Sequence, residues 1–177
     1  MAARPEIVAD FRFDPERHIY TLNGSRLPSV TEVLRPLIDY SDIPARVMDH
    51  ARQVGKAVHN AIRLHNEDDL DIESLDLEIV SRYEAWRKFQ DDTGFVVLGF
   101  EQPLYSKVHH FAGTPDLWGE QQAASTVAWL LDIKATAVIP SWTAVQTAAY
   151  QNLLWTTTGR KFQRAALHLR KDGQYRF

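Results

Sequence analysis

The chain has 177 residues, of which 45% are hydrophobic and 24% charged, as expected for one globular domain with a sizeable core over residues 1–177. It contains no cysteine, so disulfides, thiolate zinc sites and cysteine-ligated iron–sulfur clusters are excluded. The net charge of -3 argues mildly against a nucleic-acid partner, unless the positive charge is concentrated on one face.

The charges are unevenly distributed along the chain. Segment 67–78 has seven acidic residues and no basic one, whereas segment 160–177 has six Lys or Arg against the single Asp172. Such asymmetry lets one face of a protein attract phosphate while another face repels it. The alternative interpretation of 67–78 is an ordinary solvated acidic loop.

The N-terminus and the most apolar stretch both argue against targeting to a membrane. Residues 1–11 contain three charged residues and no apolar run, which indicates neither a secretory signal nor an Arg-rich transit peptide. Segment 127–139 is interrupted by Asp132 and Lys134 and is too short and too charged to span a bilayer. We therefore expect a cytoplasmic location and no membrane partner.

The first predicted elements are a β-hairpin and a short helix. Residues 11–13 and 18–22 form the strands of the hairpin, around a turn at 14–16. Ser29 is followed three residues later by Glu32, which is the spacing of a capping box, so a helix begins there. Pro36 ends or kinks this helix, because proline lacks the N–H that the helix needs.

Two longer helices follow, separated by the acidic segment. The first extends from about 44 to 65 and carries one apolar stripe, which consists of Val47, Ala51, Val54, Val58 and Ile62. The second carries apolar residues from Ile79 to Phe89 and ends near Gly94, since glycine readily adopts the left-handed conformation that ends a helix.

The second half of the chain predicts a sheet. Residues 95–105, 111–118 and 126–138 are strand-like, residues 140–159 form a helix, and 164–169 with 174–177 form a last hairpin. Several helices followed by three strands, a helix and two strands predict an α/β domain. Its central mixed β-sheet is flanked by helices.

The strongest local signal for chemistry is the segment that contains Asp132 and Lys134. Side chains of a strand alternate between its two faces, so these two charges share one face while Leu131 and Ile133 share the other. Charges that project from an apolar strand are costly unless they are paired or used. A simple Asp–Lys pair at the end of a strand is the alternative interpretation.

A second carboxylate, Asp116, ends the segment 113–116, whose Pro115 cannot donate to a β-ladder and so predicts a bend or a sheet edge. Neighbouring strands lie about 5 Å apart, so Asp116 and Asp132 on adjacent strands could hold one cation. Carboxylate oxygens without a thiolate favour Mg²⁺ or Mn²⁺ over zinc.

Such a site would have a direct mechanism for hydrolysing a phosphodiester. A divalent cation lowers the pKa of a bound water and neutralises the charge that builds on the phosphate. Lys134 lies two residues from Asp132, where it could orient that water or stabilise the developing charge. No covalent intermediate is needed.

A basic face on the 44–65 helix is a further candidate. Arg52, Lys56, His59 and Arg63 are spaced by four, three and four residues and therefore share one face, which could lie along phosphates. Gly55 falls on this face and would let the helix approach a backbone closely. A histidine packed beside an apolar stripe is the alternative interpretation of His59.

Three more residues are candidates on weaker grounds. Glu101 lies on the first predicted strand, fifteen residues before Asp116, where a surface acid is an equally good interpretation. Gln146 and Tyr150 are one turn apart on the last predicted helix, and the alternative there is an ordinary half-buried face.

Taken together, these residues resemble the PD-(D/E)xK nuclease superfamily and, within it, the RecB-like exonuclease branch. Residues 55–59 match the G-x-x-x-H motif, Glu101 the upstream acid, and 113–116 the G-x-P-D element. Residues 132–134 match (D/E)-x-K, and 146–150 match Q-x-x-x-Y. Segment 27–34 is similar to one found in phage members and in the mitochondrial genome maintenance exonuclease. Asp132 stands where many members of the branch have Glu.

The resemblance implies a role for each matched residue and a restriction-endonuclease-like core. His59, Asp116, Asp132 and the Ile133 carbonyl would bind the metal, with Glu101 as a further ligand. Lys134 would be catalytic, and Gln146 and Tyr150 would line the site or contact DNA. The implied partners are DNA, with single strands or ends favoured, and phage recombination or replication proteins in a bacterial host cytoplasm.

Three functions compete at this point. The first is a metal-dependent exonuclease that acts on DNA ends in phage recombination, replication or repair. The second is a structure-specific endonuclease on the same core, and the third is a nuclease-like domain that binds DNA without cutting it. The intact set of Asp116, Asp132 and Lys134 favours an enzyme, since a binding module has no need of it.

Overall fold

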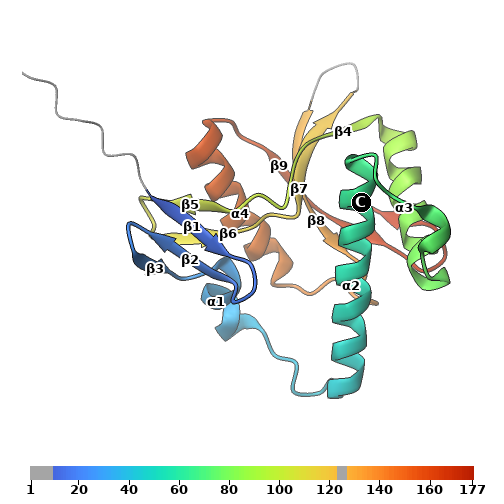
Figure 1. Cartoon of the computed structure of the whole chain (residues 1–177), viewed down its shortest axis with the longest axis horizontal. Helices are drawn as coiled ribbons and strands as arrows, with labels where there is room; N and C mark the ends of the chain where they lie inside the picture. The colour runs from blue at the N-terminus through green and yellow to red at the C-terminus, as the bar shows by residue number, and fades with distance from the viewer. Residues whose placement is uncertain (1–9, 123–126) are drawn as a thin grey trace, which may run out of the picture.

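The computed structural model describes residues 10–122 and 127–177 (Figure 1). Most of the segment used for the leader prediction, residues 1–9, lies outside it, as does Thr126, the first residue of the third predicted strand. The described chain is mixed α/β, with four α-helices and three separate sheets. None of the described helices has both the length and the apolar character needed to cross a membrane.

The N-terminal part forms a small antiparallel sheet followed by a capped helix. Its strands are β1 (Phe11–Asp14), β2 (Ile19–Leu22) and β3 (Ser25–Leu27), so the predicted hairpin is present and gains a third strand. Helix α1 (Val30–Leu34) begins at the predicted capping box of Ser29 and Glu32. It continues as a 3₁₀ turn (Arg35–Leu37) that contains Pro36.

Helices α2 (Ala45–Asn66) and α3 (Leu77–Thr93) agree closely with the predicted helices. Within the acidic segment between them lies a short 3₁₀ turn, Ile72–Ser74. Gly94 ends α3 with a φ of 61°, the left-handed conformation that was expected of it. The two helices pack against each other and against one face of the main sheet.

The first two predicted strands are each divided in two. The observed strands are β4 (Phe95–Phe100), β5 (Leu104–Ser106), β6 (Phe111–Gly113) and β7 (Leu117–Gln121). The breaks occur where Pro103 and Pro115 have no N–H for a ladder. Glu101 takes a φ of 43° and lies just beyond β4, which corrects its predicted place on a strand. Strands β5 and β6 pair with each other, outside the main sheet.

The main sheet has five strands in the order β10–β9–β8–β7–β4. Its remaining members are β8 (Val127–Lys134), β9 (Gln163–Leu169) and β10 (Tyr175–Arg176). Strands β8 and β9 are parallel and are connected by helix α4 (Thr143–Thr158), whereas the other pairs are antiparallel. The prediction of a mixed sheet is therefore confirmed.

Helices cover both faces of this sheet, α2 and α3 on one side and α4 with α1 on the other (Figure 1). Leu131 and Ile133 of β8 belong to the core beneath α2 and α3, while Leu130 belongs to the core beneath α4. This alternation confirms that Asp132 and Lys134 share one face of β8, the face toward α4.

The N-terminal sheet is attached close to the strand that precedes Asp116. The backbone of Ala112 on β6 donates to the Pro28 carbonyl at 3.0 Å. The hydroxyls of Tyr20 on β2 and Thr114 lie 2.7 Å apart, within hydrogen-bond distance. These contacts join residues more than eighty positions apart and bring the β1–β2 turn next to the predicted site.

Candidate functional site

Asp132 and Lys134 end strand β8 and form the centre of the candidate site. The Asp132 side chain is 1% exposed, and the Lys134 ammonium lies 2.7 Å from its Oδ2. The other carboxylate oxygen, Oδ1, has no hydrogen-bond donor among the described residues. Burial and the Asp116 carboxylate raise the pKa of Asp132, against the opposing effects of Lys134 and His59.

Asp116 lies at the start of β7, across from Asp132 on β8. The two strands pair with Leu117 opposite Leu131, so the next position of the antiparallel register brings the two acids face to face. The Ile133 backbone donates to Asp116 Oδ2 at 2.7 Å. A strand residue points its N–H and its carbonyl to the same side, so the Ile133 carbonyl is also directed toward Asp116.

Helix α2 contributes His59, which lies between two carboxylates. Its Nδ1 is 3.2 Å from Glu101 Oε1, and its Nε2 is 3.8 Å from Asp116 Oδ2. Burial lowers the pKa of His59, but Asp116, Glu101 and Asp132 together outweigh this and raise it to about 9. The imidazole is therefore protonated at neutral pH in the protein without a cation.

Gln146 and Tyr150 of α4 lie behind Lys134, away from solvent. Lys134 donates to Gln146 Oε1 at 3.2 Å, and Gln146 Nε2 donates to the Tyr150 hydroxyl at 3.4 Å. Burial and the Asp116 carboxylate raise the pKa of Tyr150, so its hydroxyl stays protonated. Both side chains are buried, which favours positioning of Lys134 over direct contact with a substrate.

The basic face of α2 is only partly directed at the site. Lys56 and His59 border a cavity of about 630 Å³ that also contains Glu101 and Asp116. Arg52 is instead paired with Asp49, and Arg63 with Glu67, as neighbours on the same helix. The predicted strip of four cations thus supplies two groups to the cavity.

Gly55 lies on the wall of this cavity. A side-chain carbon built at Gly55 meets no atom within 4 Å, so no backbone of the described chain approaches the helix there. The missing side chain leaves open space in the cavity wall, and the close approach of a bound backbone stays a prediction.

Three further residues, which no sequence pattern indicated, line this cavity. They are Phe13, Pro15 and His18, around the β1–β2 turn. Their rings form a small cluster in which Phe13 stacks on Tyr20 at 4.6 Å and meets His18 edge-on at 5.5 Å. No local pattern marks these residues, because their place at the site depends on contacts with the distant Thr114 loop.

Two further unpredicted residues hold the chain just after Lys134. The guanidinium of the buried Arg82, on α3, donates to the Ala135 carbonyl at 3.2 Å. The His168 ring on β9 lies 2.7 Å from the Thr136 carbonyl. These bonds fix the end of β8 and with it the place of Lys134.

The donors are suited to a hard cation, although they do not surround one as they stand. Among residues 10–122 and 127–177, no three His, Asp or Glu side chains form a group that could hold one metal ion. Two positive side chains, Lys134 and His59, lie against the acids instead. The observation that fits a cation is Oδ1 of the buried Asp132, which has no donor among the described residues while Oδ2 is paired with Lys134.

Comparison of the sequence with protein-family models found no match, and comparison with curated proteins found none either.

Proposed function

We propose that this chain is a divalent-metal-dependent deoxyribonuclease that hydrolyses phosphodiester bonds from DNA ends. One observation supports the proposal above the others. Contacts join Glu101 to His59 and His59 to Asp116, and others join Asp132 to Lys134 and Lys134 to Gln146. The two groups meet at the two acids, because the Asp116 carboxylate raises the pKa of Asp132. These are the residues whose spacing resembled the PD-(D/E)xK motifs.

The chemistry of the donor set favours Mg²⁺ or Mn²⁺. Asp116, Asp132, the Ile133 carbonyl and His59 would hold the cation, with Glu101 beside them. All but His59 offer oxygen, the ligand that hard cations prefer. The cation would supply charge neutralisation on the phosphate and activation of water. The two positive charges of the cation would replace the positive charges of His59 and Lys134, which now lie against the carboxylates.

The side chains around this position have separate roles in the proposal. Lys134, released from Asp132 and held by Gln146, would stabilise the charge that develops on the phosphate. Asp116 would be oriented by the Ile133 backbone. Lys56, at the cavity mouth, would attract the strand by its charge.

The arrangement of the elements supports the finer fold proposal, a restriction-endonuclease-like core. Asp116 directly precedes β7 and Asp132 lies on the adjacent strand β8 of a mixed sheet, and both faces of that sheet are covered by helices. The D-x-K segment ends the central strand β8, and α4 returns the chain to the parallel strand β9.

The proposal is tested by incubating the purified chain with labelled linear single- and double-stranded DNA. We expect cleavage with Mg²⁺ or Mn²⁺ and none in excess EDTA, because the carboxylates require a hard cation to act. Sizing the products separates mononucleotide release from internal cuts. Strong cutting in excess EDTA contradicts the metal mechanism.

Two variants test the assigned residues. Asp132→Ala and Lys134→Ala should each reduce cleavage by about 10²–10³-fold or more while the protein stays folded. Asp132→Ala should also lose Mn²⁺ binding, measured by calorimetry, whereas Lys134→Ala should keep it. The matched controls are Asp91→Ala and Lys171→Ala, at exposed positions outside the site. Full activity in either site variant refutes the proposed site.

A further inference from the structure

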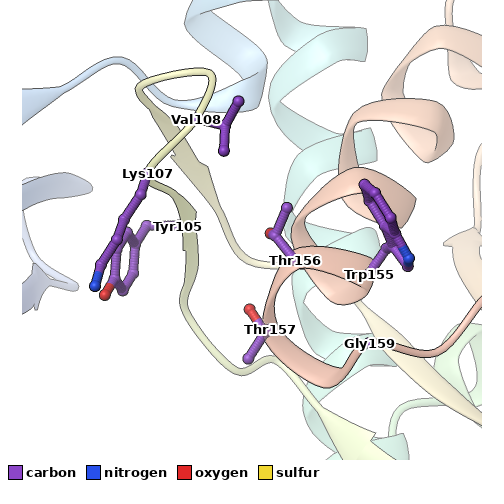
Figure 2. Close-up of a pocket in the computed structure, with 7 residues that line it drawn as sticks. All are labelled: Tyr105, Lys107, Val108, Trp155, Thr156, Thr157 and Gly159. Carbon is purple, nitrogen blue, oxygen red and sulfur yellow. The ribbon is translucent and has the colours of Figure 1, made fainter.

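The fold leaves the side chain of Trp155, near the end of α4, largely uncovered. It is 50% exposed, whereas the other four tryptophans, all in the described chain, are buried or half-buried. A large exposed aromatic ring is more informative than an exposed aliphatic one, because burying tryptophan gains much free energy. Figure 2 shows the ring projecting from α4 on the side away from Tyr105 and Lys107.

Trp155 separates two hollows in the surface. One, of about 690 Å³, lies between the last turn of α4 and the β5–β6 turn, where Lys107 is found (Figure 2). The other, of about 490 Å³, is bordered by Gln151 and Lys161. The same two residues border a third hollow of about 430 Å³ with Arg160. The three hollows share residues and so form one series along α4.

The charge of this series is uniformly positive. Lys107, Lys161 and Arg160 line it, and no Asp or Glu of the described residues does. Arg160 is paired with Glu120, but neither lysine has a carboxylate partner in residues 10–122 and 127–177. Helix α4 itself has no charged residue. A partner suited to this surface therefore carries negative charge and offers a flat face to the indole ring.

We propose that the surface formed by Trp155, Gln151 and Lys161 is a second binding site for a single-stranded nucleic acid. One base stacks on Trp155, and a flanking phosphate lies against Lys161. The inference rests on the proposed function for its choice of ligand. It goes further by assigning a contact outside the catalytic cavity, which Trp155 does not line.

The chemistry favours a single strand over a duplex. Bases in a duplex are stacked on one another, so their flat faces are not available to a side chain. An isolated lysine would also neutralise few phosphates of a duplex. Tyr150 and Trp155 lie five residues apart on one helix, so α4 links the proposed catalytic and strand-binding regions.

The test measures binding without cleavage. The full chain is titrated against a fluorescently labelled oligothymidine in EDTA, and the dissociation constant is read from anisotropy. Trp155→Ala should weaken binding about tenfold, through loss of one stacked base, and Trp155→Phe should restore most of the affinity. Leu77→Ala, on the exposed face of α3, is the matched control and should have no effect.

A second measurement tests the lysine. Lys161→Ala should reduce the slope of log K against log salt by about 0.7, the value for one phosphate contact on a single strand. Lys171→Ala, on the β9–β10 turn, should leave the slope unchanged. Circular dichroism of each variant establishes that it is folded.

Three outcomes overturn the inference. They are absence of strand binding by the wild type, equal affinity of Trp155→Ala, and equally tight Trp155-dependent binding of duplex. If Trp155→Ala converts a dimer to a monomer and leaves the affinity for the strand unchanged, the inference is also overturned. Trp155 then lies in an interface between copies of the chain. The binding assay contains no metal, so it is independent of cleavage. If the wild type binds the strand but shows no nuclease activity with metal, the proposed function alone is refuted. If the wild type cleaves DNA but Trp155→Ala binds the strand equally well, this inference alone is refuted.

Discussion

The Asp132 carboxylate opposes folding in the protein without a cation. It is buried, its pKa is raised by burial and by Asp116, and its Oδ1 lacks a hydrogen bond. Lys134 offsets part of this cost, but the pair itself is almost fully removed from water. A buried residue that destabilises the fold is typical of a functional site, because side chains placed for activity often lower stability.

Asp132→Asn should therefore stabilise the metal-free protein. The neutral amide removes the cost of the buried charge, and we expect a melting temperature roughly 2–4 °C higher in EDTA, which is the shift that about 1 kcal/mol produces at this size. Added Mn²⁺ should raise the melting temperature of the wild type but not that of the variant. A lower melting temperature for Asp132→Asn in EDTA would show that the Lys134 pair is worth more than the carboxylate costs.

His59→Ala separates a ligand from a packing residue. If His59 serves the cation, the variant should bind Mn²⁺ at least tenfold more weakly and cut correspondingly less. Its melting temperature in EDTA should fall, because the imidazolium that lies between Asp116 and Glu101 is lost. Unchanged Mn²⁺ affinity together with normal cutting by the folded fraction identifies a packed histidine.

Some of the site could be predicted residue by residue. The two-residue period of a strand placed Asp132 and Lys134 on one face, and the structure agrees. The helical period placed Arg52 and Arg63 beside His59, but it could not show that local acids pair with both. Phe13 and His18 were not predicted, because tertiary contacts far apart in the sequence bring them to the cavity.

At the level of elements, Gly113 and Gly55 differ in packing: the first lies in a close contact between elements and the second in open space. A side-chain carbon at Gly113, on β6, would come within 2.8 Å of Val30 on α1 and 2.9 Å of the Tyr150 ring on α4. Gly113 thus allows β6, α1 and α4 to pack closely. Gly55, in contrast, has open space around it in the middle of α2.

Alanine at these two positions should change stability in opposite directions. Gly113→Ala should lower the free energy of unfolding by about 1–3 kcal/mol, because the added carbon overpacks the contact between elements. Gly55→Ala should raise it by about 0.5–1 kcal/mol, since alanine is the better helix former and nothing obstructs it. Urea denaturation measures both. Equal effects of the two substitutions would contradict the packing described for β6.

The contact between α2 and α3 predicts a pH effect. His65 of α2 lies 3.1 Å from the Tyr83 hydroxyl and 3.2 Å from Gln90 Oε1. Burial lowers the pKa of His65, Arg87 adds to this, and Gln90 and Asp68 act in the opposite direction. At pH values between the lowered pKa of the folded protein and the ordinary pKa of 6.5, the unfolded chain binds a proton that the folded chain does not. Stability is therefore lost as the pH falls through this range.

His65→Gln should reduce the loss of stability at low pH, because glutamine does not titrate. We expect the melting temperature of the wild type to fall more than that of the variant between about pH 7.5 and about pH 5.5, a range that includes the ordinary histidine pKa. Differential scanning fluorimetry across buffers of equal ionic strength measures it. Parallel curves for the two proteins would show that His65 does not contribute to the pH dependence.

The ends of the helices were easier to predict than the ends of the strands. Capping at Ser29 and the left-handed Gly94 are local effects, so a short sequence determines them. Pro103 marks the break between β4 and β5, but the pairing of β5 is not local. Whether a β-prone segment stays in a sheet depends on which strand lies beside it, and β5 pairs with β6 rather than with the main sheet.

At the scale of the whole molecule, few cations of this acidic protein border the two proposed sites. The net charge is -3, and acidic residues dominate segment 67–78. Among the described residues, Lys56 borders the catalytic cavity and Lys161 borders the hollow beside Trp155. Because non-specific duplex affinity scales with the phosphates neutralised, these few cations should hold the interior of a duplex weakly at physiological salt.

We therefore predict that cleavage needs a free end and that a single-stranded end is favoured. A strand end can enter a cavity of about 630 Å³ whose far side is closed by the β1–β2 turn, while the following bases stack at Trp155. The test offers closed circular single-stranded DNA and the same molecule linearised, at equal nucleotide concentration. Progressive release of mononucleotides or short oligonucleotides from the linear form alone is the expected result. Comparable cutting of the circle would exclude an end requirement and would establish the alternative, an endonuclease on the same core.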